Sequence, residues 1–269
     1  MPKALILYKI KKDYSPNEIV EKLMGKPALQ KLLSSLQSYY IDSKEKARAR
    51  IVRIWMNNIK AEKVVCNEPK YPGNRAELLL EYQYSLKYPS SLGSIRKITI
   101  INIPVAHYLW LRRKSPLLVF MDIIKRGLSK VLIEALSYAI YGRPDIIQPL
   151  SLKFEDFESI EAWIRGEEGS KGFIKRAVFG DTIVEESHLE EVSVRRTPLE
   201  SQPIFKNVKE NSRRWISLTF VTPMMEEVGT RITCKISYNG SMVIYTPLHD
   251  LTTLDVFLSK LESILALTH

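Results

Sequence analysis

The chain has 269 residues, of which 45% are hydrophobic and 26% charged, and this balance excludes a disordered or membrane-embedded chain. Its net charge of +10 is unevenly spread, because residues 1–150 carry 26 Lys and Arg against 12 Asp and Glu, whereas residues 151–269 carry 14 against 18. The two cysteines, Cys66 and Cys234, exclude a disulfide scaffold and favour a reducing, intracellular compartment.

Residues 1–62 are predicted to form a mainly helical domain, in which the short apolar run 4–10 is either a strand or a helix turn. Ser15 and Pro16 have the pattern of a helix start, and leucines at helical spacing predict a second helix over residues 28–40. A third helix is predicted after Asp42. On it, a stripe of polar and basic side chains lies opposite an apolar face, at spacings of four and three: Lys46, Arg50, Arg53, Asn57 and Lys60.

Residues 63–165 are predicted to form a central sheet domain with one long helix. Alternating apolar residues predict strands, and Pro116 is predicted to open a helix that ends before Gly142. The expected strands are residues 77–88, 95–103, 106–111 and 148–154, and the expected helices are residues 116–141 and 155–164. The long helix carries charged residues, which favours a core helix over a membrane span.

The glycine-rich segment 166–172 is the candidate linker to a third domain, residues 173–269. There Asn239 and Gly240 predict a tight turn between two strands. The expected strands are residues 173–184, 192–195, 215–222, 230–238 and 242–246, followed by a helix over residues 253–267. Strands followed by a covering helix, occurring twice, predict the α+β class.

No recognisable active site is present in the sequence. It has no Walker loop, no dinucleotide-binding fingerprint and no HExxH motif. His107 lies in an apolar strand, and His188 and His249 are followed by carboxylates in a way that is common in loops. We therefore expect no catalytic residue, no metal site and no cofactor, and we interpret the protein as a non-enzyme.

Clusters of cations make phosphate binding the leading prediction. Three consecutive cations between a strand and the long helix cannot all be paired locally, and a helix N-terminus favours an anion there. The candidate DNA-binding residues are Lys9, Lys11, Lys12, Lys46, Arg50, Arg53, Arg112, Arg113 and Lys114. Alternatively, these are solvated basic surfaces that keep the protein soluble.

The C-terminal hairpin is the candidate surface for a protein partner. Apolar and polar residues alternate along it, so one face is expected to be buried and the other wet. If one of its strands lies at the sheet edge, a second chain can pair with it; alternatively, helix 253–267 covers the hairpin and no edge is free. The candidate partner-binding residues are Ile232, Cys234, Ile236, Tyr238 and Ile244.

Three segments resemble the inner-kinetochore centromere protein N family. The first is Leu111 to Leu118, with Arg112, Arg113 and Lys114 between a strand and a helix. The stretch from Tyr14 to Tyr40 is similar to the family's opening helices, and Gly229 to Leu251 is similar to its last hairpin.

The resemblance implies a pyrin-like N-terminal domain, a central sheet domain and a C-terminal dimerisation domain. It implies a nuclear, non-enzymatic protein that binds duplex or nucleosomal DNA at the centromere and pairs with a centromere protein L-like subunit. Contacts to the centromeric histone nucleosome and to other inner-kinetochore subunits are further implied partners. Arg112 and Arg113 match DNA-contacting arginines of the family, and Lys153 matches a later basic position.

Two other function classes remain open from the sequence. One is an RNA-binding or RNA-processing protein of two sheet-and-helix modules, with His107 or His188 as the base. The other is a basic interaction protein that binds no nucleic acid.

Overall fold

The computed structural model shows an antiparallel β-protein with helices, divided into two compact units. Unit 1 consists of Met1–Leu7 and Pro149–His269, and unit 2 of Tyr8–Gln148. The structure describes residues 2–11, 14, 22, 34, 49–57, 75–92, 95–112, 117–121, 133–134, 136–138, 140–166, 171–184, 187–195, 198–199, 201–248 and 251–267, with the backbone alone over 49–112.

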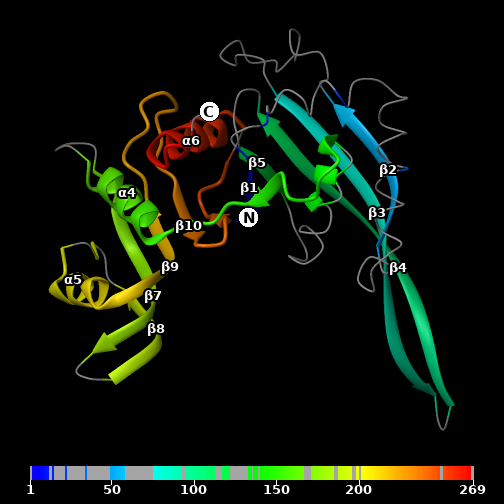
Figure 1. Ribbon diagram of the computed structural model, residues 1–269, viewed down its shortest axis with the longest axis horizontal. Helices are drawn as coiled ribbons and strands as arrows, with labels where there is room; N and C mark the ends of the chain where they lie inside the picture. The colour runs from blue at the N-terminus through cyan, green and yellow to red at the C-terminus, as the bar shows by residue number, and fades with distance from the viewer. Residues whose placement is uncertain are drawn as a thin grey trace. The chain divides into compact units, whose positions relative to one another are not determined.

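Unit 1 is built on one antiparallel sheet with three helices (Figure 1). Its strands are residues 3–7 of β1 (Lys3–Ile10), with β7 (Phe173–Val184), β8 (Ser187–Arg195), β9 (Ser212–Val221), β10 (Thr233–Ser237) and β11 (Ser241–Ile244). The spatial order is β1, β11, β10, β9, β7, β8, so the first strand of the chain pairs with the last. The helices are α4 (Phe154–Arg165), α5 (Pro203–Glu210) and α6 (Leu251–Ile264).

The core of unit 1 is aromatic and lies between the sheet and the helices. Trp215 on β9 is 2% exposed, and its ring stacks on that of Phe157 in α4 at 5.3 Å between centroids. Trp163 of α4 contacts Phe220 of β9 and Phe257 of α6. These contacts place α4 and α6 on the same face of the sheet.

The turn between β10 and β11 is the one that the Asn-Gly pair predicts. Gly240 has a φ of 74°, and a Cβ atom there would lie 2.8 Å from the carbonyl oxygen of Leu7. This close approach allows a hydrogen bond, in which Leu7 donates its backbone N–H to the carbonyl of Gly240 at 2.9 Å. This turn therefore fixes β1 to the C-terminal hairpin.

Unit 2 contains a long hairpin and two flanking strands. β2 (Ala49–Asn57), β3 (Arg75–Leu92), β4 (Ile95–Arg112) and β5 (Leu117–Met121) pair in that order, all antiparallel. β3 and β4 pair along their whole length, from Arg75 opposite Arg112 to Leu92 opposite Ile95. β6 (Ile147–Pro149) pairs with β1. No helix in the described part of the chain is long and apolar enough to cross a membrane.

The predicted mixture of sheet and helix is confirmed, but the N-terminal helical domain is not supported. Residues 3–10 form strand β1. The expected third helix is wrong over residues 49–57, which form strand β2. The segment is rich in β-branched residues, and a register shift between Ile51 and Arg53 lets a helix-like apolar spacing fit a bulged strand. Lys22 and Ser34 are helical, whereas the rest of residues 15–48 lies outside the described residues.

Three further boundaries differ from the sequence predictions. Residues 117–121 are strand β5, so the expected long helix does not begin at Pro116, but the described residues 133–134, 136–138 and 140–141 are helical up to Gly142 as predicted. The strand expected over residues 148–154 is the short β6, which ends at Pro149, and α4 begins at Phe154. The division between the units falls at residues 148 and 149, so α4 and the glycine-rich segment after it belong to unit 1.

Candidate nucleic-acid interface

Helices α4 and α5 contact one face of the sheet, and α6 packs against α4. Phe157 of α4 and Phe205 of α5 both contact Trp215, and Phe205 also contacts Phe179 of β7. Phe220 and Leu218, both fully buried, share this face with Cys234 and Ile236 by their register. We call it the helix-covered face.

The opposite face carries a row of cations. Arg176 of β7 lies opposite Arg195 of β8 on one side and opposite Thr219 of β9 on the other. Thr219 in turn lies opposite Lys235 of β10. Residues directly opposite one another in a sheet share a face, so these four strands contribute to one row. Lys175, at a register shift in β7, adds a fourth cation. We call the surface of Lys175, Arg176, Arg195 and Lys235 the basic sheet face.

The cations of the basic sheet face have no carboxylate partners in the part of the chain that the structure describes. Arg176 donates from Nε to the Ser193 hydroxyl at 2.9 Å, and the Lys175 ammonium lies 5.7 Å from the ring centroid of Phe173. Nearby, Arg231 precedes β10, and its Nε atom is buried without a hydrogen-bond partner. The four cations of the basic sheet face therefore form no ion pair with a described carboxylate, although Glu191 of β8 lies on the same face by its register opposite Gly180.

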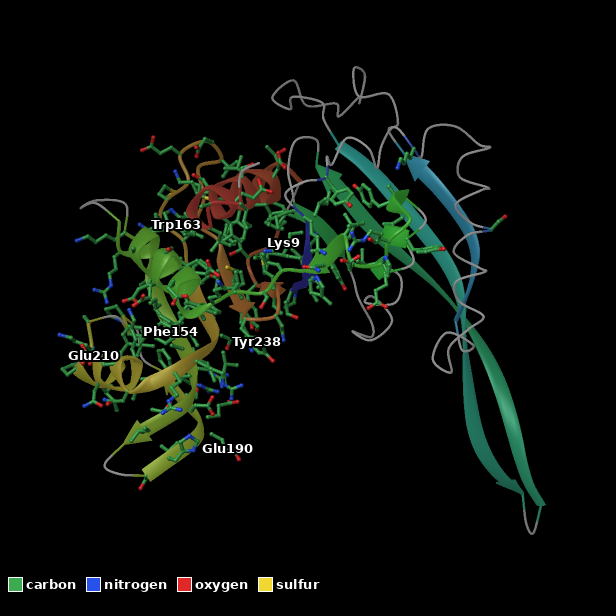
Figure 2. The ribbon with its side chains drawn as sticks, viewed as in Figure 1. Lys9, Phe154, Trp163, Glu190, Glu210 and Tyr238 are labelled. Atoms are coloured by element: carbon green, nitrogen blue, oxygen red, sulfur yellow. The ribbon has the colours of Figure 1, made fainter. Side chains whose placement is uncertain are left out.

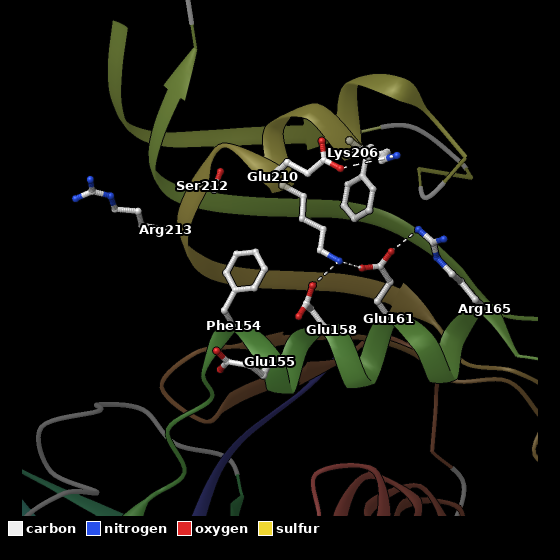
Figure 3. Close-up of a pocket in the computed structure, with 11 residues that line it drawn as sticks. Phe154, Glu155, Glu158, Glu161, Arg165, Lys206, Glu210, Ser212 and Arg213 are labelled. Atoms are coloured by element: carbon white, nitrogen blue, oxygen red, sulfur yellow. Dashed lines mark hydrogen bonds and ion pairs between the residues drawn. The ribbon is translucent and has the colours of Figure 1, made fainter. Parts of the chain in front are cut away.

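A cluster of carboxylates lies on α4 and α5 (Figure 3). Lys209 of α5 bridges Glu158 at 3.0 Å and Glu161 at 2.8 Å, and Arg165 pairs with Glu161 as well. Burial lowers the pKa of Lys209, but hydrogen bonds from its ammonium to Glu161 and Glu158 outweigh this and raise it overall. Part of the negative charge of residues 151–269 therefore lies on the helix-covered face, on the other side of the sheet from Arg176, Arg195 and Lys235.

A small pocket of about 250 Å³ lies beside a bulge of β9 at Ile216, where the register shifts between Ser217 opposite Val178 and Trp215 opposite Phe179. Its cations are Lys153, which precedes α4, together with Arg213 and Arg214 of β9. Its walls include the rings of Phe154, Trp215 and Tyr238. Figure 2 shows Tyr238 at the end of β10, where the hairpin turns, and its side chain is 47% exposed.

The sequence-predicted DNA-binding residues do not converge on one described site. Lys9 is half-buried on β1, whereas Lys11 pairs with Asp145, which also binds Arg143 at 3.1 Å. Hydrogen bonds from Lys11 and then from Arg143 lower the pKa of the Asp145 carboxyl. Arg50 and Arg53 lie on β2 rather than on a helix, and Arg112 ends β4 opposite Arg75. Lys153 lines the pocket, and the remaining four lie outside the described residues: Lys12, Lys46, Arg113 and Lys114.

The predicted partner-binding residues lie mostly in the core. The alternation along the hairpin is as predicted, but Ile232, Cys234, Ile236 and Ile244 are all 0% exposed and only Tyr238 reaches the surface. Both hairpin strands are internal, because β10 lies between β9 and β11, and β11 between β10 and β1. Of the two alternatives, the hairpin therefore has no free edge, and β8 lies at the end of the sheet order among the described strands.

Groups that could support catalysis are dispersed in the described residues. His188 is exposed on β8. His107 lies on β4, opposite Leu80 of β3, and His249 lies outside the described residues. Burial raises the pKa of the Cys234 thiol well above its usual value, which disfavours a nucleophilic thiolate. Within the described ranges, no group of three or more His, Cys, Asp or Glu side chains could hold a metal ion.

No protein-family model matches this chain, and a comparison with curated proteins gives no match either. The basic sheet face was missed by the sequence interpretation because its cations come from separate strands, residues 175, 176, 195 and 235. The only available signal was the alternation in β10, which predicts Lys235 on the wet face.

Proposed function

We propose that this protein is a non-enzymatic nucleic-acid-binding scaffold whose basic sheet face contacts the phosphate backbone of duplex DNA. The observation that carries the proposal is the row of Arg195, Arg176 and Lys235 in cross-strand register with no described carboxylate partner. Unneutralised cations on one surface release DNA counterions on binding, and this supplies sequence-independent affinity.

The dimensions of the row suit a duplex. Neighbouring strands lie about 4.8 Å apart, so three strand spacings from β8 to β10 span roughly 14 Å. The major groove of B-DNA is about 12 Å wide, so a row of this length is wide enough to contact phosphates on both sides of the groove. Thr219 and Ser193 add hydroxyl donors to the same face.

The kinetochore part of the proposal rests on the resemblance alone. The opening helices that contribute to it are only partly within the described residues, and strand β2 occupies the place of the expected third helix. A centromeric, nuclear location, a centromere protein L-like partner and contact with the centromeric nucleosome stay predictions. DNA binding by unit 1 does not depend on them.

A protein partner is placed by this proposal at the edge strand β8 rather than at the hairpin. Nearly all of β8 is exposed, including Leu189 at 40%, and its outer edge has no paired strand among the described elements. An unpaired edge can accept a strand from a second chain, and Glu190 and Glu191 favour a basic one.

Hydrogen exchange tests this placement of the partner. We expect hydrogen exchange of the β8 amides to slow when the full chain is co-purified with its partner, because new cross-strand hydrogen bonds protect them. The amides of β10 serve as the internal control, since that strand is already paired on both sides. Protection centred on β10 and β11, or a chain that purifies alone, would contradict the β8 assignment.

DNA binding is tested by titrating labelled duplex DNA at several salt concentrations and following fluorescence anisotropy. The test variant is Arg176→Ala, Arg195→Ala and Lys235→Ala combined. We expect its salt slope to fall by about 2–3 units, because each lost phosphate contact removes roughly 0.9. Affinity should fall alike for unrelated duplexes, since phosphate contacts carry no sequence information.

The matched control removes three cations from elsewhere in unit 1: Lys171→Ala, Lys206→Ala and Lys260→Ala, all of them exposed. Its net charge equals that of the test variant, so a long-range charge effect would change both variants equally. Equal salt slopes in the two variants would overturn the proposed interface. Preferential binding of duplex RNA in the same titration would favour the RNA-binding alternative.

A further inference from the structure

We infer that the pocket beside the β9 bulge binds a single nucleotide, with its phosphate on the cations and its base against the aromatic walls. The pocket is lined by Lys153, Arg213 and Arg214, and by Phe154, Trp215 and Tyr238. This inference rests on the proposed function only where the nucleotide belongs to a nucleic-acid strand.

The cations at the pocket are available for an anion. Arg214 pairs with Asp181, but neither Lys153 nor Arg213 forms an ion pair with a described carboxylate. Figure 3 shows the guanidinium of Arg213 apart from the carboxylates of Glu155, Glu158 and Glu161. Two unpaired cations match the charge of about −1.5 to −2 on a phosphomonoester.

The walls of the pocket favour an aromatic ligand over a bare anion. Phe154 and Trp215 lie with their ring centroids 5.5 Å apart, and Tyr238 is 47% exposed. The buried Trp215 indole N–H lacks a hydrogen-bond partner. A volume of about 250 Å³ is slightly below the roughly 300–1,000 Å³ of drug-sized ligand pockets, which suits one nucleotide. Base-on-aromatic stacking contributes about 1–3 kcal/mol per base.

The pocket adjoins the basic sheet face. Arg214 lies opposite Gly180 of β7. By the alternation along β7, Gly180 shares a face with Val178 and Arg176. Ile216, another wall residue, lies close to Gly180, since a Cβ atom on that glycine would be 3.0 Å from the Ile216 side chain. A strand whose phosphates follow the basic sheet face can therefore place an unstacked or terminal nucleotide in the pocket.

The test titrates the full chain with adenosine 5′-monophosphate and with a single-stranded oligonucleotide, following intrinsic tryptophan fluorescence. We expect binding of both, and loss of the fluorescence change in Trp215→Phe. Lys153→Ala combined with Arg213→Ala should weaken the mononucleotide about tenfold or more, because a charge-assisted hydrogen bond contributes roughly 1.5–3 kcal/mol. Adenosine without phosphate and inorganic phosphate alone should each bind more weakly than the nucleotide.

Arg176→Ala combined with Arg195→Ala is the matched control, since it also removes two charges from unit 1. It should weaken the oligonucleotide but leave the mononucleotide unchanged. If adenosine 5′-monophosphate gives no signal and the pocket variant binds the oligonucleotide like the wild type, the inference is overturned, whatever the duplex titrations show. If the sheet-face variants bind duplex DNA normally while the pocket variant loses the mononucleotide, the inference stands and the proposed function fails. Equal affinity for inorganic phosphate and the nucleotide would overturn the base-binding role of the aromatic walls.

Discussion

Replacing Trp215 by alanine is expected to lower the free energy of unfolding by about 3–5 kcal/mol, as for other large aromatic side chains in cores. The side chain is 2% exposed and meets Phe179 at 4.8 Å, Phe157 at 5.3 Å and Phe205 at 6.0 Å between ring centroids. Alanine leaves a cavity that three separate elements would have to close. Urea unfolding followed by circular dichroism measures the loss.

Trp215→Phe is the conservative control for this prediction. It keeps an aromatic ring in the cluster and removes an indole N–H that makes no hydrogen bond. Because no partner is left unsatisfied, we expect a loss of less than about 1.5 kcal/mol. A loss below about 1 kcal/mol in Trp215→Ala itself would show that the aromatic cluster does not dominate the stability of unit 1.

Local patterns predicted the C-terminal unit well. The strand expected over residues 173–184 is β7 at its observed bounds, and the Asn239–Gly240 pair predicted the hairpin turn, because only a few residue types tolerate a positive φ there. Helices α4 and α6 were also expected within a few residues. Helix α5 was missed, since its eight residues have only Phe205 and Val208 on the buried side.

Long-range pairing could not be predicted from the same patterns. That β1 pairs with β11 depends on a contact between the two ends of the sequence, which no local period records. The basic sheet face has the same origin, because Arg195 and Arg176 become neighbours only through the β7–β8 register. Net charge was misleading as well, since −4 over a segment says nothing about which face carries the cations.

Lys209 lies in the ion cluster between α4 and α5, and Lys209→Met is expected to lower the free energy of unfolding by about 3–5 kcal/mol at pH 7. The side chain of Glu161 is 6% exposed and that of Lys209 is 21% exposed, so removal of the ammonium leaves a nearly buried carboxylate with Arg165 as its remaining partner. Breaking a buried pair from one side is costly for this reason. The variant also loses the contact of the ammonium with the Trp215 ring, 5.5 Å from its centroid.

Lys206→Met, on the same helix, is the matched control. Its pair with Glu210 is 3.8 Å long and both side chains are largely exposed, so we expect a change of no more than about 0.5 kcal/mol. Equal losses in the two variants would show that α5 responds to charge or helix propensity rather than to the buried cluster.

The pH dependence of the difference between wild type and Lys209→Met follows from the raised pKa of Lys209. The folded state holds this proton more tightly than the unfolded chain, whose lysine has a pKa near 10.5. The stabilisation is therefore complete below pH 10.5 and is lost as the pH rises through the higher pKa of the folded state. Urea titrations from neutral to strongly alkaline pH should show a constant difference in unfolding free energy that shrinks only above this range. A difference that disappears between pH 7 and 9 would mean that another group controls the cluster, and that the acidic helices are not neutralised by Lys209.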